Sequence, residues 1–380
     1  DEDLRADRQP EFTQVDIEMS FVQGDDVIDM MEDVMAETLE AVGVEHPFPL
    51  PRMQYAEAME RFGCDRPDTR FGMELVNLTE IVRGCGFGVF AKAVEAGGVV
   101  KAINCKGAGD WSRGDVEKLA DIAAANGAKG MAWIAFTTDG KEKSPIIKFF
   151  SDEEFDALKE AMDVEPGDLL LFAADTYEVA SAVLSALRLH MADALNVPRE
   201  GHQLLWVVNF PMFKYDEDEK KYAAEHHPFT HVLDEDVDKI ESDPLACGSY
   251  SYDLVMDGFE VGGGTIRIHN ADEQRADEPR RAGDGHGVDV AAGQTGHCQR
   301  AVGQLGDDLH VRARGDLGYD AAVNGVQVSL GKDLIGQHLA PVAHEGDGRL
   351  VTGGFNRKNN HIVSASLRNQ VMRSASSSGF

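Results

Sequence analysis

The chain has 380 residues, enough for two or three domains with ample hydrophobic cores. Hydrophobic residues make up 43% of it, yet no apolar run approaches 18 residues, which excludes a membrane-spanning helix. The formal net charge of −31 makes the chain a poor general nucleic-acid binder, because contacts to phosphate need Lys and Arg, so any such contact would need local basic patches or another part of the molecule.

Polar and apolar residues alternate from Glu11 to Met19, which predicts a half-buried strand. One face of this strand is apolar and can pack on a core; it carries Val15, Ile17 and Met19. The opposite face offers carboxylates and an amide, which suit an amino acid and a nucleotide; it carries Gln14, Asp16 and Glu18. From this pattern alone, a solvated antiparallel strand is the alternative interpretation.

Two helices are expected next. Residues 26–43 have apolar side chains at helical spacing, which indicates an amphipathic helix packed on the core. A shorter helix is expected at residues 54–62.

Residues 75–197 have the pattern of a separate α+β unit. Strands are expected at residues 97–105, 130–136, 145–150 and 168–174, and helices at 112–126, 152–163 and 175–195. Ser151 and Glu154 have the spacing of a capping box at the start of the second helix. The unit has no recognisable nucleophile–base pair, which favours a structural or tRNA-proximal module.

The chain then returns to the first domain. Residues 204–208 form an apolar run typical of a buried strand, and the charged residues 215–221 indicate a solvated loop. His226 and His227 precede Pro228, which forces an extended backbone and favours a displayed loop. A histidine pair alone is more often structural than functional.

Asp257-Gly258 lies between two alternating segments, which is a strong signal for a two-residue hairpin turn. Such a turn pairs Val255 with Glu260 and Asp253 with Gly262, and it places Asp253 and Glu260 diagonally on one face. Two neighbouring carboxylates suit Mg²⁺, which takes oxygen ligands. Gly262, Gly263 and Gly264 follow within a strand, where glycines mark the close approach of a ligand or another backbone.

Five segments of the sequence resemble bacterial aspartyl-tRNA synthetases of class II. They are the opening Asp1–Asp16, with the form of the second class II motif, Arg61–Arg70, the phrases at 127–130 and 167–168, and Glu260–Asn270. The resemblance implies an α+β fold, in which a partial class II antiparallel-sheet catalytic core is interrupted by an α+β GAD insertion domain. The expected domains are residues 1–74 and 198–275 for the core, 75–197 for the insertion, and 276–380 for an unassigned tail.

The resemblance also implies roles for individual residues. L-Aspartate would be bound by Gln14, Asp16, His226 and Arg267, with Arg267 pairing with the substrate side chain. ATP would be bound by Asp1, Glu2, Gln9, Glu260, Gly262, Gly263 and Gly264, with Arg5 and Arg8 bracing the motif loop. Asp253 and Glu260 would hold Mg²⁺, and no side chain is expected to act as a catalytic acid, base or nucleophile. The motif's arginine would stand directly before Asp1, outside this sequence.

The resemblance ends near residue 275. From residue 276 onward there are 11 acidic and 11 basic side chains, so the acidic excess, 56 against 25, lies in the first 275 residues. The tail shows no clean helical or strand period, and the third class II motif is not found in it. We interpret it as a frameshifted or chimeric stretch; an unfamiliar appended domain is the alternative, and its six histidines do not favour a metal site.

The leading hypothesis is a fragment of an aspartate–tRNA ligase. The intact enzyme would use ATP to activate L-aspartate and would transfer it to tRNA(Asp), with tRNA(Asn) as a further candidate, as a homodimer without membrane contact. The five cysteines form no CxxC pair and no signal peptide is visible, which fits a reducing cytoplasm. Because motifs are missing, we expect this polypeptide alone to be inactive. The alternative is a non-catalytic synthetase-like module that binds an amino acid, a nucleotide or a partner.

Overall fold

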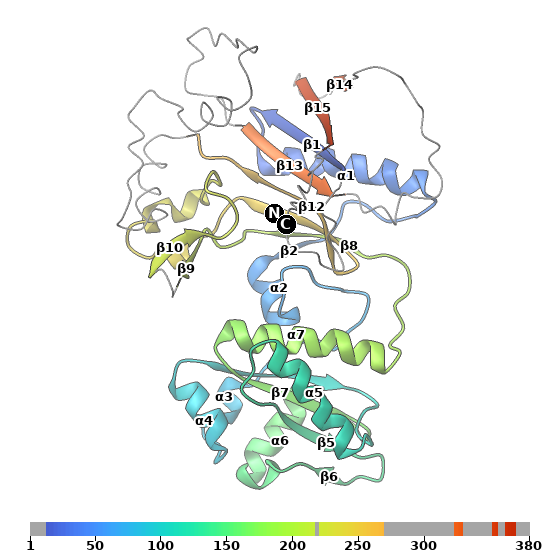
Figure 1. Ribbon diagram of the computed structural model, residues 1–380, viewed down its shortest axis with the longest axis vertical. Coiled ribbons are helices and arrows are strands. Elements are labelled where there is room, and N and C mark those ends of the chain that lie inside the picture. Colours follow the sequence, from blue (N-terminus) through green and yellow to red (C-terminus); the bar gives the residue numbers. More distant parts are fainter. Residues whose placement is uncertain (1–12, 217–219, 270–322, 330–351, 356–361, 370–380) are drawn as a thin grey trace, which may run out of the picture.

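The computed structural model describes residues 13–216, 220–269, 323–329, 352–355 and 362–369. Among them, two sheets stand one above the other, with helices α2 (Tyr55–Phe62) and α7 (Tyr177–Ala194) between them (Figure 1). We call the two halves the eight-stranded unit and the five-stranded unit.

The eight-stranded sheet has the order β14-β15-β1-β13-β12-β11-β8-β2. Its strands are β1 (Thr13–Ser20), β2 (Arg52–Gln54), β8 (Leu204–Val208), β11 (Ser251–Met256), β12 (Phe259–Ile266), β13 (Val323–Ser329), β14 (Thr352–Phe355) and β15 (Ile362–Asn369). All neighbours are antiparallel except β2 and β8. Strand β1, predicted from its alternation, is confirmed.

Helix α1 (Gly24–Ala41) covers one face of this sheet, as its apolar spacing predicts. Its buried residues Val27 and Met31 pack in one cluster with Ile17 and Met19 of β1 and with Trp206 of β8. The apolar face of β1 is therefore turned to the core, and the polar face is left for the other side of the sheet.

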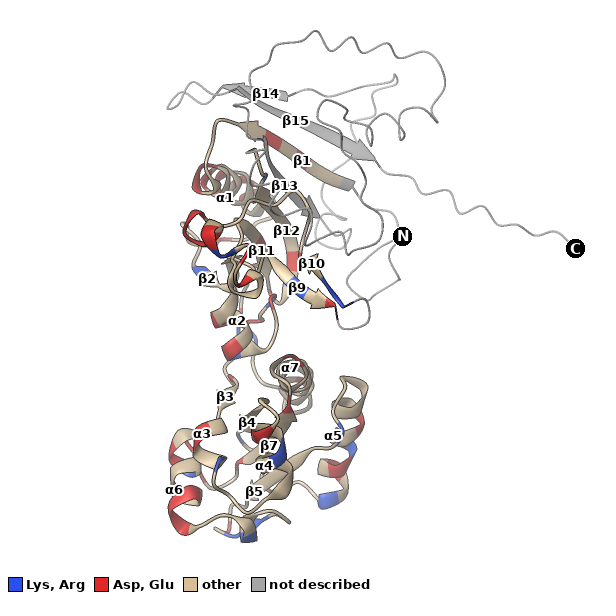
Figure 2. Cartoon of the chain, turned by 90° about the vertical axis from the view of Figure 1, so that its left-hand side faces the viewer, with Lys and Arg blue, Asp and Glu red and all other residues tan. Residues whose placement is uncertain are grey.

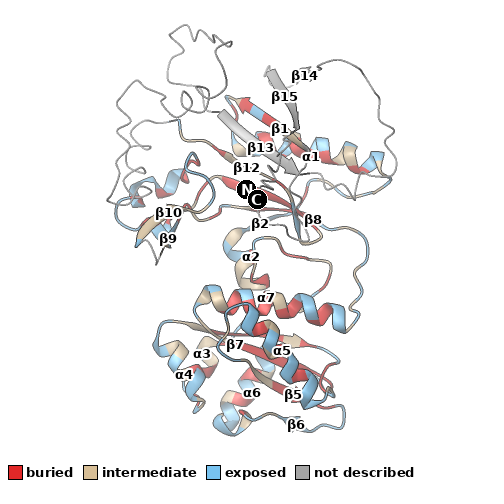
Figure 3. Cartoon of the chain, viewed as in Figure 1, coloured by how far each residue is buried: buried red, intermediate tan, exposed pale blue. Residues whose placement is uncertain are grey.

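The five-stranded sheet has the order β3-β4-β7-β5-β6 and is antiparallel throughout. Its strands are β3 (Val76–Asn77), β4 (Val99–Cys105), β5 (Ala132–Phe136), β6 (Glu142–Lys143) and β7 (Leu169–Asp175). Helices α5 (Arg113–Ala125) and α7 pack on one face, and α3 (Thr79–Val82), α4 (Gly88–Glu95) and α6 (Asp152–Ala161) on the other. Buried residues follow β4, β7 and the inner side of α7 (Figure 3).

Most elements predicted for the five-stranded unit are confirmed, including the Ser151–Glu154 capping box, whose two hydrogen bonds measure 2.9 and 3.2 Å. The strand predicted at 145–150 is wrong, because residues Ile147–Phe149 form a 3₁₀ helix. The Ser144 hydroxyl donates to the Trp133 carbonyl and accepts from the Ile146 amide, which turns the chain there. Helices α3 and α4 were not predicted.

Two further predictions from the pattern are corrected. The solvated loop expected at 215–221 is in part a hairpin of β9 (Phe213–Asp216) and β10 (Lys221–Ala224), because Phe213 is buried and the Tyr215 ring packs edge-on against the Tyr222 ring at 5.3 Å between centroids. In the stretch after residue 275, where no strand period was traced, β13 pairs with β1 and β12. The interpretation of residues 276–380 as a stretch never selected to fold stays a prediction.

The loop between α2 and β3 joins the two units. Helix α2 ends at Gly63, whose φ is +71°, and a Cβ there would lie 2.4 Å from the Ser181 carbonyl oxygen of α7. Only glycine allows this close approach. Further along the loop, Arg70 donates to both carboxylate oxygens of Asp68, at 2.9 and 2.8 Å, and to the Asp257 carbonyl at 3.3 Å. The loop therefore holds the turn of the β11–β12 hairpin.

Lys101 of β4 is fully buried at the same junction. Its ammonium lies 2.6 Å from a Glu60 carboxylate oxygen and 4.0 Å from the centre of the Tyr177 ring, and the Tyr177 hydroxyl donates to the same oxygen at 3.0 Å. Burial would raise the pKa of Glu60, but the hydrogen bond and charge of Lys101 outweigh it, so the pKa lies below its usual value.

Acid should weaken this junction. Because the folded-state pKa of Glu60 is lowered, its contribution to stability is complete above the unfolded value near 4.5 and is lost as the pH falls through the folded value. Glu60→Gln should cost about 2 kcal/mol at pH 7, since it strips a buried ammonium of its charge partner although Glu60 itself is half exposed. Urea titrations at pH 7 and pH 4 measure both effects. A variant as stable as the parent at pH 7 would contradict the prediction, and adding Lys101→Met should restore most of the loss.

Candidate functional site

A cavity of about 460 Å³ opens on the sheet face opposite α1. Strands β1, β11 and β12 form its floor, and the segment after β10 forms one wall. It is lined by Gln14, Asp16, Glu18, His226, His227, Thr230, Ser251, Asp253, Glu260, Gly263, Gly264, Thr265 and Arg267. The structure thus brings together eight of the residues that the sequence analysis selected.

The side chains from β1 reach this cavity because of the strand's period of two. Gln14, Asp16 and Glu18 all line it, whereas Ile17 and Met19 are buried on the other face. Glu18 was seen on the polar face but was not selected as a site residue. Its regular spacing after Asp16 was the signal that could have identified it.

Asp253 and Glu260 approach each other across the β11–β12 hairpin. The turn is as predicted, with Val255 opposite Glu260, but the predicted pairing of Asp253 with Gly262 is wrong. The register shifts between Leu254 and Val255, which puts Asp253 opposite Gly263 instead.

Gly263 makes room for these two carboxylates. A Cβ at this position would lie 2.5 Å from Asp253 Oδ1 and 3.6 Å from Glu260 Oε1, so both side chains share the space over it. Burial, then the charges of Glu260 and Asp65, raise the pKa of Asp253 well above its usual value. Two carboxylates this close can accept a divalent cation. Among the described residues, no three or more His, Cys, Asp or Glu side chains are grouped for a metal.

Arg267 enters the cavity just beyond the end of β12, where its backbone bridges to Thr230. Its Nη2 lies 3.4 Å from Glu18 Oε1, and both side chains are partly open to solvent, at 40% and 52%. The guanidinium is therefore held from one side and can present its remaining donors to a carboxylate.

His226 lies on the wall of the cavity, edge-on to the Phe210 ring at 4.3 Å between centroids. Desolvation lowers the pKa of His226 in spite of the opposing charges of Glu225 and Asp65, so the imidazole is neutral at pH 7. It can donate or accept a hydrogen bond without adding charge.

The remaining predicted residues have other positions. Gly263 and Gly264 line the cavity, whereas Gly262 lies one residue earlier, opposite Leu254, and is not a lining residue. Asp1, Glu2 and Gln9 fall outside the described residues, as do Arg5 and Arg8. Thr230, Ser251 and Thr265 line the cavity and were missed, since isolated hydroxyl residues carry no sequence signal.

The cavity is predominantly acidic. Four carboxylates line it, from Asp16, Glu18, Asp253 and Glu260, and Arg267 is the one Lys or Arg among its described lining residues. Acidic side chains are also spread over helices of both units, including α1 and α6 (Figure 2). The site is suited to a ligand with an ammonium group or a metal at one end and a single carboxylate at the other.

Comparisons with known proteins agree with this chemistry. The family described as tRNA synthetases class II (D, K and N) matches residues 1–280. The chain is 51% identical over 277 residues to the aspartate–tRNA(Asp/Asn) ligase of Anoxybacillus flavithermus, covering 72% of this chain and 47% of that protein. It is 49% identical over 271 residues to that of Geotalea uraniireducens, covering 71% and 46%.

A third relative has the narrower name of aspartate–tRNA ligase. It comes from Geobacillus kaustophilus and is 51% identical over 278 residues, covering 72% of this chain and 47% of that protein. The chain thus spans about half the length of the curated relatives it matches. None of the helices described is both long enough and apolar enough to cross a membrane.

Proposed function

The chain belongs to the class II tRNA synthetases of the D, K and N group, and from this premise we propose that it carries the amino-acid site of an aspartate–tRNA ligase. In the complete enzyme, ATP would activate L-aspartate as the adenylate and release pyrophosphate. The aspartyl group would then pass to the terminal ribose of tRNA.

One observation carries the choice of aspartate within this group. Arg267 is the one Lys or Arg among the described lining residues of a cavity that holds four carboxylates, and its guanidinium lies 3.4 Å from Glu18. A substrate carboxylate can make a paired, charge-assisted contact with it, whereas the amide of asparagine gains less and the ammonium of lysine is repelled. Asp16 and Gln14, on β1, would take the α-ammonium and carboxylate of the substrate, and neutral His226 would contact its side chain.

The ATP end of the site would lie over β12. We propose that ATP binds beside Gly263, Gly264 and Glu260, which line this end of the cavity. Gly262, Asp1, Glu2 and Gln9 complete our proposed ATP set. We place Mg²⁺ between Asp253 and Glu260, because the two carboxylates share the space over Gly263 and Mg²⁺ takes oxygen ligands. The metal would neutralise phosphate charge, while the chain's own residues hold the two substrates in line.

The proposal also covers the domains, the oligomeric state, the location and the tRNA substrates. We assign residues 1–74 and 198–275 to the catalytic core and 75–197 to a GAD insertion domain. We further propose a homodimer in the cytoplasm that charges tRNA(Asp). We propose tRNA(Asn) as a second substrate, because two of the relatives are named aspartate–tRNA(Asp/Asn) ligases.

Binding of a stable adenylate analogue tests the proposal. The full chain should bind the sulfamoyl analogue of aspartyl-adenylate at least 100-fold more tightly than the asparaginyl analogue. Replacing the substrate carboxylate by an amide leaves the Arg267 guanidinium without its charged partner, which costs about 3 kcal/mol of binding free energy. Isothermal titration calorimetry measures both constants. Equal affinities for the aspartyl, asparaginyl and lysyl analogues would contradict the assignment.

Mg²⁺ should stabilise the chain through the carboxylate pair. In the presence of ATP, millimolar Mg²⁺ should raise the melting temperature of the parent by a few degrees, as expected for a ligand that binds only the folded state. Asp253→Asn should lose this shift, because the cation then has one carboxylate. Glu235→Gln, which changes an exposed carboxylate elsewhere, is the matched control. The same shift in Asp253→Asn as in the parent would remove the metal assignment.

A further inference from the structure

In the sheet of the five-stranded unit, strand β5 covers only part of the edge of its neighbour β7. β5 begins at Ala132, opposite Phe172, while β7 continues to Asp175. The last three residues of β7, from Ala173 to Asp175, therefore pair with β4 on one side and with no described strand on the other. We call these three residues the open edge.

The direction of the backbone groups at the open edge follows from two hydrogen bonds. The Phe136 amide donates to the Asp168 carbonyl at 2.7 Å, so Asp168 faces β5, and by strand alternation Phe172 and Ala174 do so too. Independently, the Leu78 amide donates to the Val100 carbonyl at 2.8 Å, so Val100 faces β3. Val100 stands opposite Ala174, which confirms that the N–H and C=O of Ala174 point away from β4.

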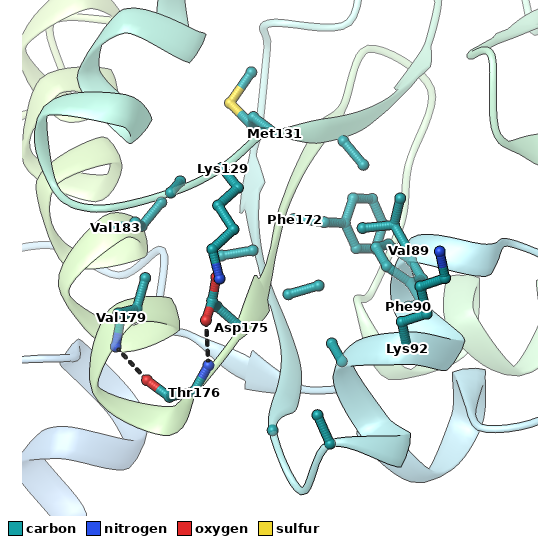
Figure 4. A pocket seen from close by; sticks show the side chains of 18 of the residues that line it. Val89, Phe90, Lys92, Lys129, Met131, Phe172, Asp175, Thr176, Val179 and Val183 are labelled. Carbon is teal, nitrogen blue, oxygen red and sulfur yellow. Dashed lines mark hydrogen bonds and ion pairs between the residues drawn. The ribbon is translucent and has the colours of Figure 1, made fainter.

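A cavity of about 500 Å³ lies beside the open edge. Val179 and Val183 of α7 line one side of it, Val89 and Phe90 of α4 line the other, and Phe172 lies between them (Figure 4). Val179 and Val183 belong to the hydrophobic layer on one face of the sheet, and Phe90 and Phe172 to the layer on the other face. The cavity thus spans both faces at the point where a strand is missing.

This shape matches an extended chain better than a compact ligand. Successive side chains of a strand point to opposite faces of a sheet, so one residue would enter the α7 side and the next the α4 side. The backbone of the same segment would reach the free N–H and C=O of Ala174, which an apolar small molecule cannot use.

The rim of the cavity adds a charge preference. Lys129 lines it beside Asp175, at 3.4 Å between Nζ and Oδ2, and the exposed Lys92 of α4 stands on the opposite side (Figure 4). Two ammonium groups against one carboxylate leave the rim positive within a strongly acidic chain. An acidic residue in the occupant would complement it.

We propose that the open edge binds an extended peptide by strand addition to β7, and that the peptide carries alternating apolar side chains and an acidic residue that meets Lys92. Backbone hydrogen bonds supply affinity in this mode of recognition, and the two halves of the cavity select side chains.

Peptide display tests the proposal. A random heptapeptide library selected on the immobilised full chain should enrich sequences with alternating apolar residues and one Asp or Glu. The enriched peptide, labelled and measured by fluorescence anisotropy, should bind Lys92→Glu at least tenfold more weakly than the parent. Lys143→Glu makes the same charge change on the exposed β6, outside the cavity, and should bind within twofold of the parent.

N-methylated peptides give a second measurement that needs no protein variant. Methylation at alternate residues, those whose N–H faces β7, should weaken binding at least tenfold, and methylation at the residues between them should not. No enrichment over the support, or a uniform response to methylation with no effect of Lys92→Glu, would overturn the proposal. A dimer of this chain that dissociates in Lys92→Glu would also overturn it, because the occupant would then be a second copy.

Discussion

Arg267→Leu is expected to abolish recognition of aspartate. The variant should bind the sulfamoyl analogue of aspartyl-adenylate at least 100-fold more weakly than the parent, because it leaves a substrate carboxylate without its paired donors, a loss of about 3 kcal/mol. The side chain is 40% exposed and its guanidinium lies 3.4 Å from the half-exposed Glu18, so the fold should tolerate the change. In a full-length enzyme, aspartate-dependent pyrophosphate exchange should fall with it.

A second variant at this position separates charge from geometry, and an arginine elsewhere serves as the control. Arg267→Lys keeps the charge but not the planar fork, so its affinity should lie between those of the parent and of Arg267→Leu. Arg83→Leu removes an exposed arginine paired with Glu80 in the other unit and should bind like the parent. An unchanged dissociation constant for Arg267→Leu would rule out Arg267 as the residue that selects aspartate.

Arg188→Ala is expected to have the largest effect on stability. The guanidinium is 2% exposed and donates to the carbonyls of Asp68, Phe71 and Gly72, at 2.9, 2.8 and 2.9 Å. It also lies over the Phe71 ring at 4.0 Å. Burial lowers the pKa of Arg188 to about 10, which keeps it charged at neutral pH. Its removal leaves three carbonyls without a donor and opens a cavity, a cost of about 3–5 kcal/mol in the free energy of unfolding.

Urea titration followed by fluorescence measures this loss. Arg113→Ala, which removes an exposed helical pair with Glu117, is the matched control and should change the free energy of unfolding by about 0.5 kcal/mol or less. The loop held by Arg188 also contacts the turn of the β11–β12 hairpin, so Mg²⁺ stabilisation should weaken in parallel. If Arg188→Ala proves as stable as Arg113→Ala, this arginine does not hold the units together.

The sequence predicts those parts of the site that local rules determine. The period of two placed Gln14 and Asp16 on the polar face of β1, and Asp257-Gly258 specified the turn, in which both residues have positive φ. The shift between Leu254 and Val255 could not be predicted in this way. It depends on how Asp253 fits over Gly263, and that is a contact between strands rather than a property of either.

Long-range pairs were beyond prediction for the same reason. Glu18 and Arg267 meet although 249 positions separate them. Lysine and arginine usually lie on the surface, yet Lys101 and Arg188 are buried. Lys101 pairs with Glu60 of α2, and Arg188 donates to the Asp68 carbonyl of the loop that follows α2. Short apolar runs were equally ambiguous: residues 145–150 pack as a 3₁₀ turn, since a few hydrophobic residues fit either structure.

The position of β1 has a consequence for synthesis on the ribosome. β1 emerges first among the described strands, but its partners β13 and β15 lie roughly 300 residues later, so at 5–20 residues per second it waits on the order of 15–60 seconds. The five-stranded unit, whose strands and helices all lie within residues 76–194, can fold meanwhile. A nascent strand left unpaired for so long is prone to aggregation, and the negative charges of Asp16 and Glu18 would keep neighbouring nascent chains apart.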